Sequence, residues 1–132
     1  MNKLYLKLAL VGALLVPSMP SMADPSMELA NICTIIKNND KSELRKKLKK
    51  VKKEYKLRLG DYYSAISCQG NSMIRHAMTS SAGEAGEYLV SQMKKSDLKK
   101  AEGDGKTIKQ WAEENGHIAS ATGSALVERL NG

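Results

Sequence analysis

Two nine-residue stretches match one another, and their match decides the expected fold. Residues 69–77 read QGNSMIRHA and residues 104–112 read DGKTIKQWA, so both follow the pattern x-G-x-[S/T]-x-x-x-x-A. In each stretch the glycine suits a turn, the hydroxyl residue suits a helix start, and the alanine suits a close approach between helices. We therefore predict two equivalent helical units, opened by Gly70 and Gly105.

This pattern resembles the turn and first helix of ankyrin repeats, whose period is about 33 residues. The second copy continues with Asn115, Gly116 and His117, which is similar to the turn between the two helices of such a repeat. The Pro-Leu-His that usually follows the threonine is absent from both copies. The resemblance covers residues 69–130 and implies two stacked ankyrin-like units, with a small helical bundle as the alternative.

The chain upstream of the repeat predicts one more helix pair. Apolar residues recur at i, i+3, i+4 and i+7 from Leu29 onward, which predicts a helix over residues 26–38. Asp40 is a suitable N-cap for a second helix. This pair, residues 26–58, would cap the stack. Residues 59–69 lack a helical period and are expected to form a connecting loop with one extended or helical turn.

Composition favours the same all-α class. The 132 residues are 42% hydrophobic but only 5% aromatic, with no Phe, so the core must be built from aliphatic side chains and Met. Further helices are predicted over residues 82–93, from Thr107 to Gly116, and over residues 118–130. The length suits one domain, so we expect stacked helix pairs in a single helical domain over residues 24–132.

Residues 1–23 have the features of a secretory signal peptide. Two early lysines precede an unbroken apolar run at residues 8–16, and small residues end the segment. Cleavage after Ala23 would start the mature chain at Asp24 and place the protein in the periplasm or outside the cell. An uncleaved anchor is the weaker alternative, because the run is about half of the roughly 20 residues that span a bilayer. No membrane span is expected after cleavage.

Export predicts a disulfide between Cys33 and Cys68, since exported proteins fold in an oxidising compartment. Such a bond would stabilise the fold by roughly 3.5 to 4 kcal/mol in the chain-entropy model. The alternative is two buried free thiols. No metal site is expected, because the two cysteines and the two histidines lack the close ligand pairs of zinc sites.

Positive charge is concentrated in one segment. Residues 41–58 contain ten basic and two acidic residues, whereas the whole chain has a net charge of +7. This helix is a candidate for binding anionic lipid, lipopolysaccharide or an acidic protein. A solvated row of lysines that covers a short apolar stripe is the alternative interpretation. The residues of the anionic-surface hypothesis are Lys46, Lys47, Lys49, Lys50, Lys52 and Lys53.

No catalytic motif is present. The sequence lacks G-x-S-x-G and H-E-x-x-H, and both histidines, His76 and His117, lie inside the repeat pattern. We therefore expect no enzymatic activity and no cofactor, and nucleic acid is not an expected ligand. The primary interpretation is a non-enzymatic module that binds a protein partner or has a structural role, with Arg75 and Gln110 beside the partner surface. A basic protein that associates with the anionic envelope is the alternative.

The overall layout also resembles a family of small exported bacterial proteins of unknown function. The matching features are the signal peptide, Cys33 in the first helix, the Asn39-Asp40 turn, and residues 67–72, which read SCQGNS. This resemblance covers residues 29–93. It supports export and the cysteine pairing, and it implies no activity.

Overall fold

The computed structural model describes residues 24–132, so the predicted signal peptide lies outside the described residues. The described chain is helical, without a β-strand, and none of its helices is long and apolar enough to cross a membrane. The helices are α1 (Ile32–Lys37), α2 (Lys41–Tyr55), α3 (Leu59–Tyr62), α4 (Met73–Thr79), α5 (Gly83–Gln92), α6 (Lys95–Leu98), α7 (Ile108–Glu114) and α8 (Ala121–Asn131), with a 3-10 turn, η2 (Tyr63–Ala65). The all-α prediction is confirmed.

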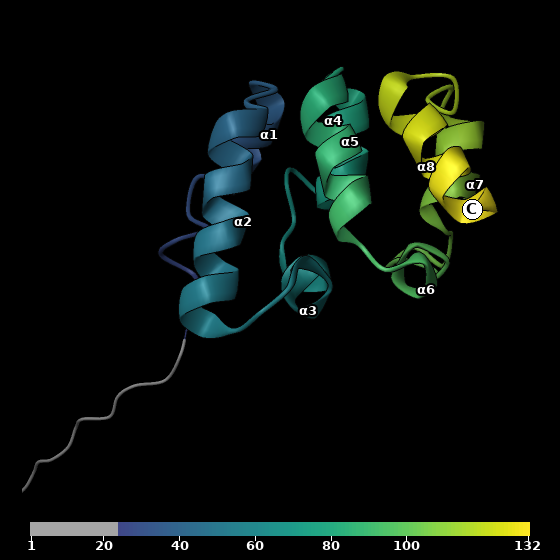
Figure 1. Cartoon of the computed structure of the whole chain (residues 1–132). Helices are drawn as coiled ribbons and strands as arrows, with labels where there is room; N and C mark the ends of the chain where they lie inside the picture. Colours follow the sequence, from purple (N-terminus) through teal and green to yellow (C-terminus); the bar gives the residue numbers. More distant parts are fainter. Residues whose placement is uncertain (1–23) are drawn as a thin grey trace, which may run out of the picture.

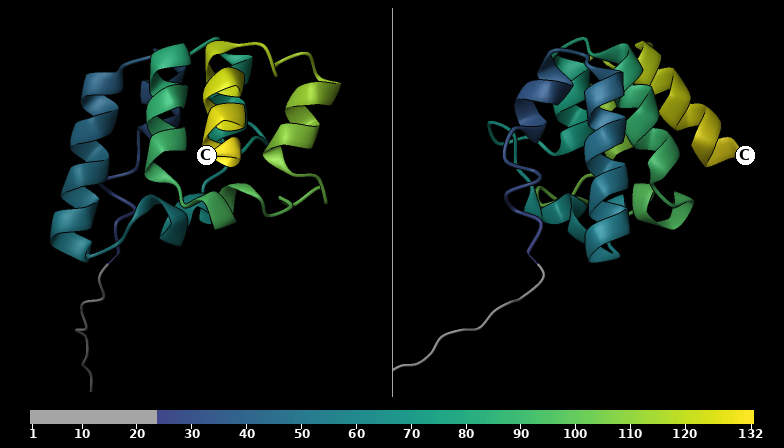
Figure 2. Two further views of the ribbon diagram at one scale, coloured as in Figure 1. Left: turned by 45° about the vertical axis from the view of Figure 1, so that its right-hand side comes forward. Right: turned by 60° about the vertical axis from the view of Figure 1, so that its left-hand side comes forward.

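Three antiparallel helix pairs stack in a row, as Figure 1 shows: α1 with α2, α4 with α5, and α7 with α8. The first helices of the pairs contact one another, and so do the second helices, which lie side by side in Figure 2. The short helices α3 and α6 lie in the connections between pairs. A stack of helix pairs is therefore the architecture that the sequence predicted.

The same turn joins the two helices of each of the three pairs. One residue adopts a left-handed conformation, and the N–H of the next residue donates to the carbonyl five residues before it. This bond satisfies a carbonyl at the end of the first helix. The left-handed residues are Asn39, Ser81 and Gly116, with φ of 56°, 54° and 77°. The bonds run from Asp40 N to Ile35 O (3.1 Å), from Ala82 N to Ala77 O (2.8 Å) and from His117 N to Ala112 O (2.8 Å). The repeated turn makes the N-terminal pair structurally equivalent to the other two at this point.

The two sequence-matched turns open α4 and α7, as predicted. Gly70 and Gly105 both have positive φ, 85° and 82°, where a side chain would be strained. Thr107 forms a capping box with Gln110 at the start of α7. Ser72 precedes α4 but accepts no cap bond, because its hydroxyl lies 2.9 Å from the Tyr63 hydroxyl instead. Ser72 therefore occupies the predicted N-cap position, but the predicted hydrogen bond from its side chain to the helix is wrong.

A disulfide joins Cys33 in α1 to Cys68 in the segment before α4, with 5.5 Å between the Cα atoms. The predicted pairing is confirmed, and it spans 35 residues of sequence. The bond fastens the first helix pair to the entrance of the second. The described residues contain no free cysteine.

Helices α5 and α8 pack closely against each other. A Cβ atom on Gly86 would overlap the side chain of Thr122, and one on Gly123 would overlap the backbone carbonyls of His117 and Ile118. Gly123 lies within α8, the final helix predicted over residues 118–130. It permits α8 to begin tightly against the preceding turn.

The first predicted helix is too long. We expected residues 26–38, but α1 spans only Ile32–Lys37. The Asp24 side chain accepts the N–H and the hydroxyl of Ser26 (3.0 and 2.6 Å), a local turn that competes with the helix. Residues 25–31 accordingly form successive turns.

The predicted connection at residues 59–69 contains the expected helical turn, α3, and in addition the 3-10 turn η2. Asp61 accepts the N–H of Arg58 at 2.8 Å and thereby caps the single turn of α3. Tyr62 and Tyr63 are both buried, and η2 follows α3 directly. Because burial of two aromatic rings holds this segment, no helical period was needed in its sequence.

Enlarging the alanine of each repeat is expected to destabilise the stack. Ala77 and Ala112 are both completely buried. Overpacking such sites typically costs 1 to 3 kcal/mol, so Ala77→Leu and Ala112→Leu should each lower the melting temperature clearly. The same change at exposed Ala101 is the control and should be nearly neutral. Equal tolerance at all three positions in thermal melts would contradict this prediction.

Candidate functional site

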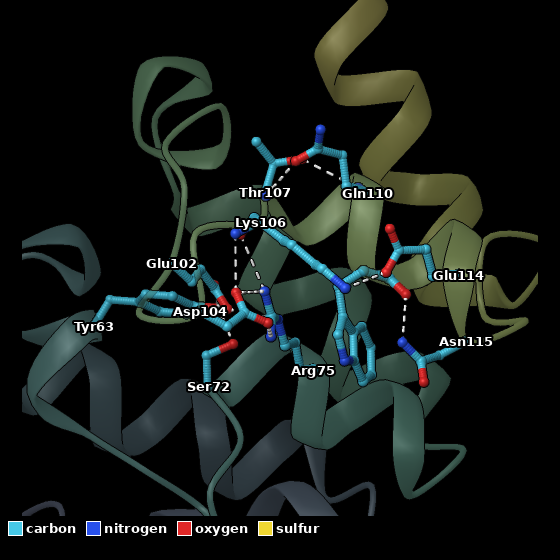
Figure 3. Close-up of polar contacts among 11 residues, drawn as sticks. Tyr63, Ser72, Arg75, Glu102, Asp104, Lys106, Thr107, Gln110, Glu114 and Asn115 are labelled. Atoms are coloured by element: carbon cyan, nitrogen blue, oxygen red, sulfur yellow. Dashed lines mark hydrogen bonds and ion pairs between the residues drawn. The ribbon is translucent and has the colours of Figure 1, made fainter.

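A pocket of about 600 Å³ opens between the start of α4, the turn at residues 102–105 and α7. Figure 3 draws its polar side chains, and there Tyr63 of η2, Arg75 of α4 and the carboxylates of Glu102 and Asp104 in the turn come together. The central side chain is Arg75, one of the two residues predicted to flank a partner surface. Arg75 is 7% exposed, so it lies inside the wall of the pocket.

All three guanidinium nitrogens of Arg75 have partners within the protein. Nη1 and Nη2 donate to the two oxygens of Asp104 at 2.8 and 3.0 Å, and Nη2 also donates to the carbonyl of Lys106 at 3.1 Å. Nε lies 2.7 Å from Glu102 Oε1, but its N–H points off that line, so this contact is an ion pair without an aligned hydrogen bond. We call Arg75, Glu102 and Asp104 the arginine clasp.

The electrostatics of the clasp match its geometry. Burial lowers the pKa of Arg75, but the carboxylates of Asp104 and Glu102 outweigh it, and the net pKa is raised. The hydrogen bond from Arg75 holds the pKa of Asp104 well below its usual value of 3.8. Arg75 is therefore a fixed cation that links α4 to the turn before α7.

Tyr63 contacts the Glu102 carboxylate of the clasp. Its hydroxyl donates toward Glu102 Oε2 at 3.1 Å and accepts the backbone N–H of Ile74 at 3.3 Å. Burial is the main cause that raises the pKa of Tyr63 above its ordinary value of 10.0. The phenol consequently stays neutral and orients the Glu102 carboxylate.

The aromatic and histidine side chains near the clasp also have structural partners. Trp111 lies beneath the Arg75 guanidinium, 5.1 Å from it, and stacks on His117 with 5.2 Å between ring centroids. His76 is buried, and its Nε2 lies 3.0 Å from the carbonyl oxygen of Cys33. This contact links α4 to α1.

The clasp predicts a specific acid response. Because the pKa of Asp104 is depressed in the folded state, its ionised form stabilises the protein above pH 3.8, and this contribution is lost as the pH falls through the folded value. Asp104→Asn should remove that part of the acid dependence. Below pH 3.8, the melting temperature should therefore fall less steeply with decreasing pH for the variant than for the wild type. Glu87→Gln, at an exposed position, should keep the wild-type slope; parallel slopes for Asp104→Asn would contradict the prediction.

The second residue of the predicted partner surface, Gln110, is exposed on α7. Its side chain accepts the N–H of Thr107 at 2.9 Å within the capping box. With Arg75 buried in the clasp, the two residues do not form one open surface. Whether a protein partner binds near Gln110 stays a prediction.

The basic helix α2 presents most of its charge to solvent. Leu44, Leu48 and Val51 face the core, whereas five of the six lysines of the anionic-surface hypothesis are exposed. The exposed lysines are Lys46, Lys49, Lys50, Lys52 and Lys53; Lys47 is half-buried. Lys50 forms an ion pair with Glu28 at 3.2 Å, and this contact raises the pKa of Lys50. The helix therefore carries a dense and largely uncompensated positive surface.

Within residues 24–132, no three His, Cys, Asp or Glu side chains come together in a group that could hold a metal ion. Glu113 and Glu114, which the sequence places on a polar helix face, lie in exposed ion pairs with Lys109 and Lys106. The Lys109–Glu113 pair is a local i,i+4 pair on α7, whereas Glu114 pairs with a lysine that precedes the helix.

The described part of the chain defines a disulfide-fastened, all-α protein of stacked helix pairs. The family described as "Protein of unknown function (DUF3718)" matches residues 32–100, just over half of the chain, so the chain belongs to this family. The match includes α1 to α6 and both cysteines, and it ends before α7. No curated protein and no solved structure matches the chain. A bacterial source for the family and kinship with ankyrin repeats stay predictions.

Proposed function

We propose that this protein is exported and acts as a non-enzymatic binding module for anionic ligands. The disulfide is compatible with export, because such bonds persist in oxidising compartments. Residues 1–23 support the same proposal through their signal-like sequence. The intact mass of the native protein tests export directly: it should correspond to a chain that begins at Asp24, and a retained Met1 would count against it.

The observation that carries the binding proposal is the exposed charge of α2. Lysines occupy most of its solvent side, and their fields add because few carboxylates lie among them. A surface of this kind attracts anionic membranes, at about 1 kcal/mol per basic residue near the lipid. The fold holds this helix on the outer side of the first pair (Figure 1), so its charge is accessible.

Two ligand classes fit a basic helix: the anionic envelope surface and an acidic protein partner. We favour the envelope surface, because Arg75 of the predicted partner surface is occupied in the clasp. An acidic protein that pairs with α2 is the second candidate. The two differ in stoichiometry and in the components needed for binding.

Sedimentation with vesicles that contain phosphatidylglycerol, across a salt series, tests this proposal. Binding should be strong at low salt and should be lost by moderate salt, since screening shortens the reach of charges to about 10 Å at 0.1 M. Vesicles of phosphatidylcholine alone are the control and should not bind. Capture of one stoichiometric protein from a periplasmic extract, without vesicle binding, would support the acidic protein partner instead.

A further inference from the structure

We propose that a groove between α2 and the α5–α6 connection is a discrete binding site for a ligand that carries two or more phosphate groups. This inference rests on the proposed anionic-ligand function and deepens it, because it assigns the binding to one concave site. The groove has a volume of about 760 Å³ and includes residues from α2, α3, α5, α6 and α8. Its basic residues are Arg45, Lys49, Lys52, Arg58, Lys94, Lys100 and Arg129.

Only two acidic residues line this groove, and both are already engaged. Asp97 forms an ion pair with Lys100 at 3.1 Å, and Asp61 accepts the backbone N–H of Arg58 at 2.8 Å. In the described part of the chain, no carboxylate oxygen forms an ion pair with Arg45, Lys49, Lys52, Arg58 or Lys94. The groove therefore holds an excess of positive charge that the protein does not neutralise.

The periodicity of α2 sorts its basic residues into two rows. Arg45, Lys49 and Lys52 follow one another at i, i+4 and i+7 and line the groove. Lys46, Lys50 and Lys53 have the same spacing one position later and do not line it. Each row contains three basic residues, but only the first row faces the groove.

The apolar lining residues and the fixed Arg129 side chain favour a ligand bound in one position over a diffuse layer of ions. Apolar side chains lie between the cations, and the Arg45 guanidinium lies 5.7 Å from the centroid of the Tyr88 ring. Arg129 is held in place because its Nη2 and Nε donate to the carbonyl of Met93 at 2.7 and 3.3 Å. A preorganised arginine beside partly apolar surface binds an oxyanion more strongly than a fully solvated one.

Phosphate is the ligand chemistry that this set of donors fits. Guanidinium and ammonium groups both bind phosphate oxygens with charge-assisted hydrogen bonds, and several cations that converge without carboxylates match more than one phosphate. The volume lies in the usual range for small-molecule sites, about 300 to 1,000 Å³, which suits a headgroup or a short polyphosphate. The two possible sources, a soluble compound and a lipid headgroup, share this chemistry.

A pair of charge-matched variants tests the groove. Lys49→Gln/Lys52→Gln removes two charges from the groove row, and Lys46→Gln/Lys53→Gln removes two from the outer row of the same helix. All four lysines are exposed, and Gln has a helix propensity similar to that of Lys, so both variants should fold. Calorimetric titration with tripolyphosphate at constant ionic strength should show about 25-fold weaker binding for the groove variant. The outer-row variant should lose less than about three-fold.

The outcomes separate the groove from the broader proposal. Equal weakening in both variants would overturn the groove and leave the anionic-surface function standing. Binding of cardiolipin vesicles, whose headgroup carries two phosphates, that the groove variant alone loses, without tripolyphosphate binding, would support the groove and identify a lipid headgroup as its source. A wild-type protein that binds neither tripolyphosphate nor these vesicles would overturn both.

Discussion

Replacing Cys33 with Ser is expected to lower the free energy of unfolding by about 2 to 5 kcal/mol, the usual cost of removing a native disulfide from a small domain. The bond joins α1 to the entrance of α4 across 35 residues, so its loss returns considerable freedom to the unfolded chain. Cys33 is the better site for the change because it is half-buried, whereas Cys68 is 1% exposed and a serine there would bury a hydroxyl. Urea unfolding of the two proteins measures the difference.

Reduced wild-type protein is the matched control for that experiment. It should unfold close to the Cys33→Ser variant, because both lack the same cross-link. With about 4 to 8 °C per kcal/mol for a domain of this size, the melting temperature should fall by roughly 10 °C or more. If the variant had the same melting temperature as the oxidised wild type, the bond would contribute little to stability.

Removal of the arginine of the clasp is expected to cost about 3 kcal/mol. Arg75→Met keeps a long apolar stem over Trp111 but leaves the Glu102 carboxylate, whose side chain is 15% exposed, without its cation. Breaking a buried ion pair at one partner typically costs 3 to 5 kcal/mol. The lower end applies here, because the Asp104 side chain is 43% exposed and can be hydrated. Urea unfolding of the folded variant measures the loss.

Two further variants make the clasp experiment specific. Lys109→Met breaks an exposed ion pair with Glu113 on α7 and should cost no more than about 0.5 kcal/mol. Adding Glu102→Gln to Arg75→Met should recover part of the loss, since the orphaned carboxylate is then absent. Equal costs for Arg75→Met and Lys109→Met would refute a special role of the clasp.

Local signals were sufficient to predict much of the fold. Gly70, Gly105 and Gly116 occupy left-handed positions that favour glycine, and Thr107 caps its helix through its own side chain. These features depend on residues a few positions apart, so the sequence displays them directly. The left-handed turns at Asn39 and Ser81 were not identified as equivalent to Gly116, because neither residue is glycine and the equivalence is visible only in the backbone bonds.

The candidate site was less predictable from sequence. The lysines of α2 were found as a group from their density, but their division into a groove row and an outer row depends on what packs beside the helix. Arg58, Lys94 and Arg129 were missed as groove residues, since they lie in separate segments with no local pattern that joins them. The sequence feature that comes closest to indicating the groove is the helical spacing of Arg45, Lys49 and Lys52, which places them on one side of α2.

The sequence by itself determined the all-α class, the repeated helix starts and the two cysteines that pair, because these follow from composition, short-range periodicity and local turn chemistry. The tertiary structure alone decided that Arg75 is buried and bonded to Asp104, 29 residues away. It also decided which cations share a groove. The physical reason is that ion pairs and grooves between distant segments depend on how helices pack, and packing buries or exposes a given side chain regardless of its neighbours in the chain.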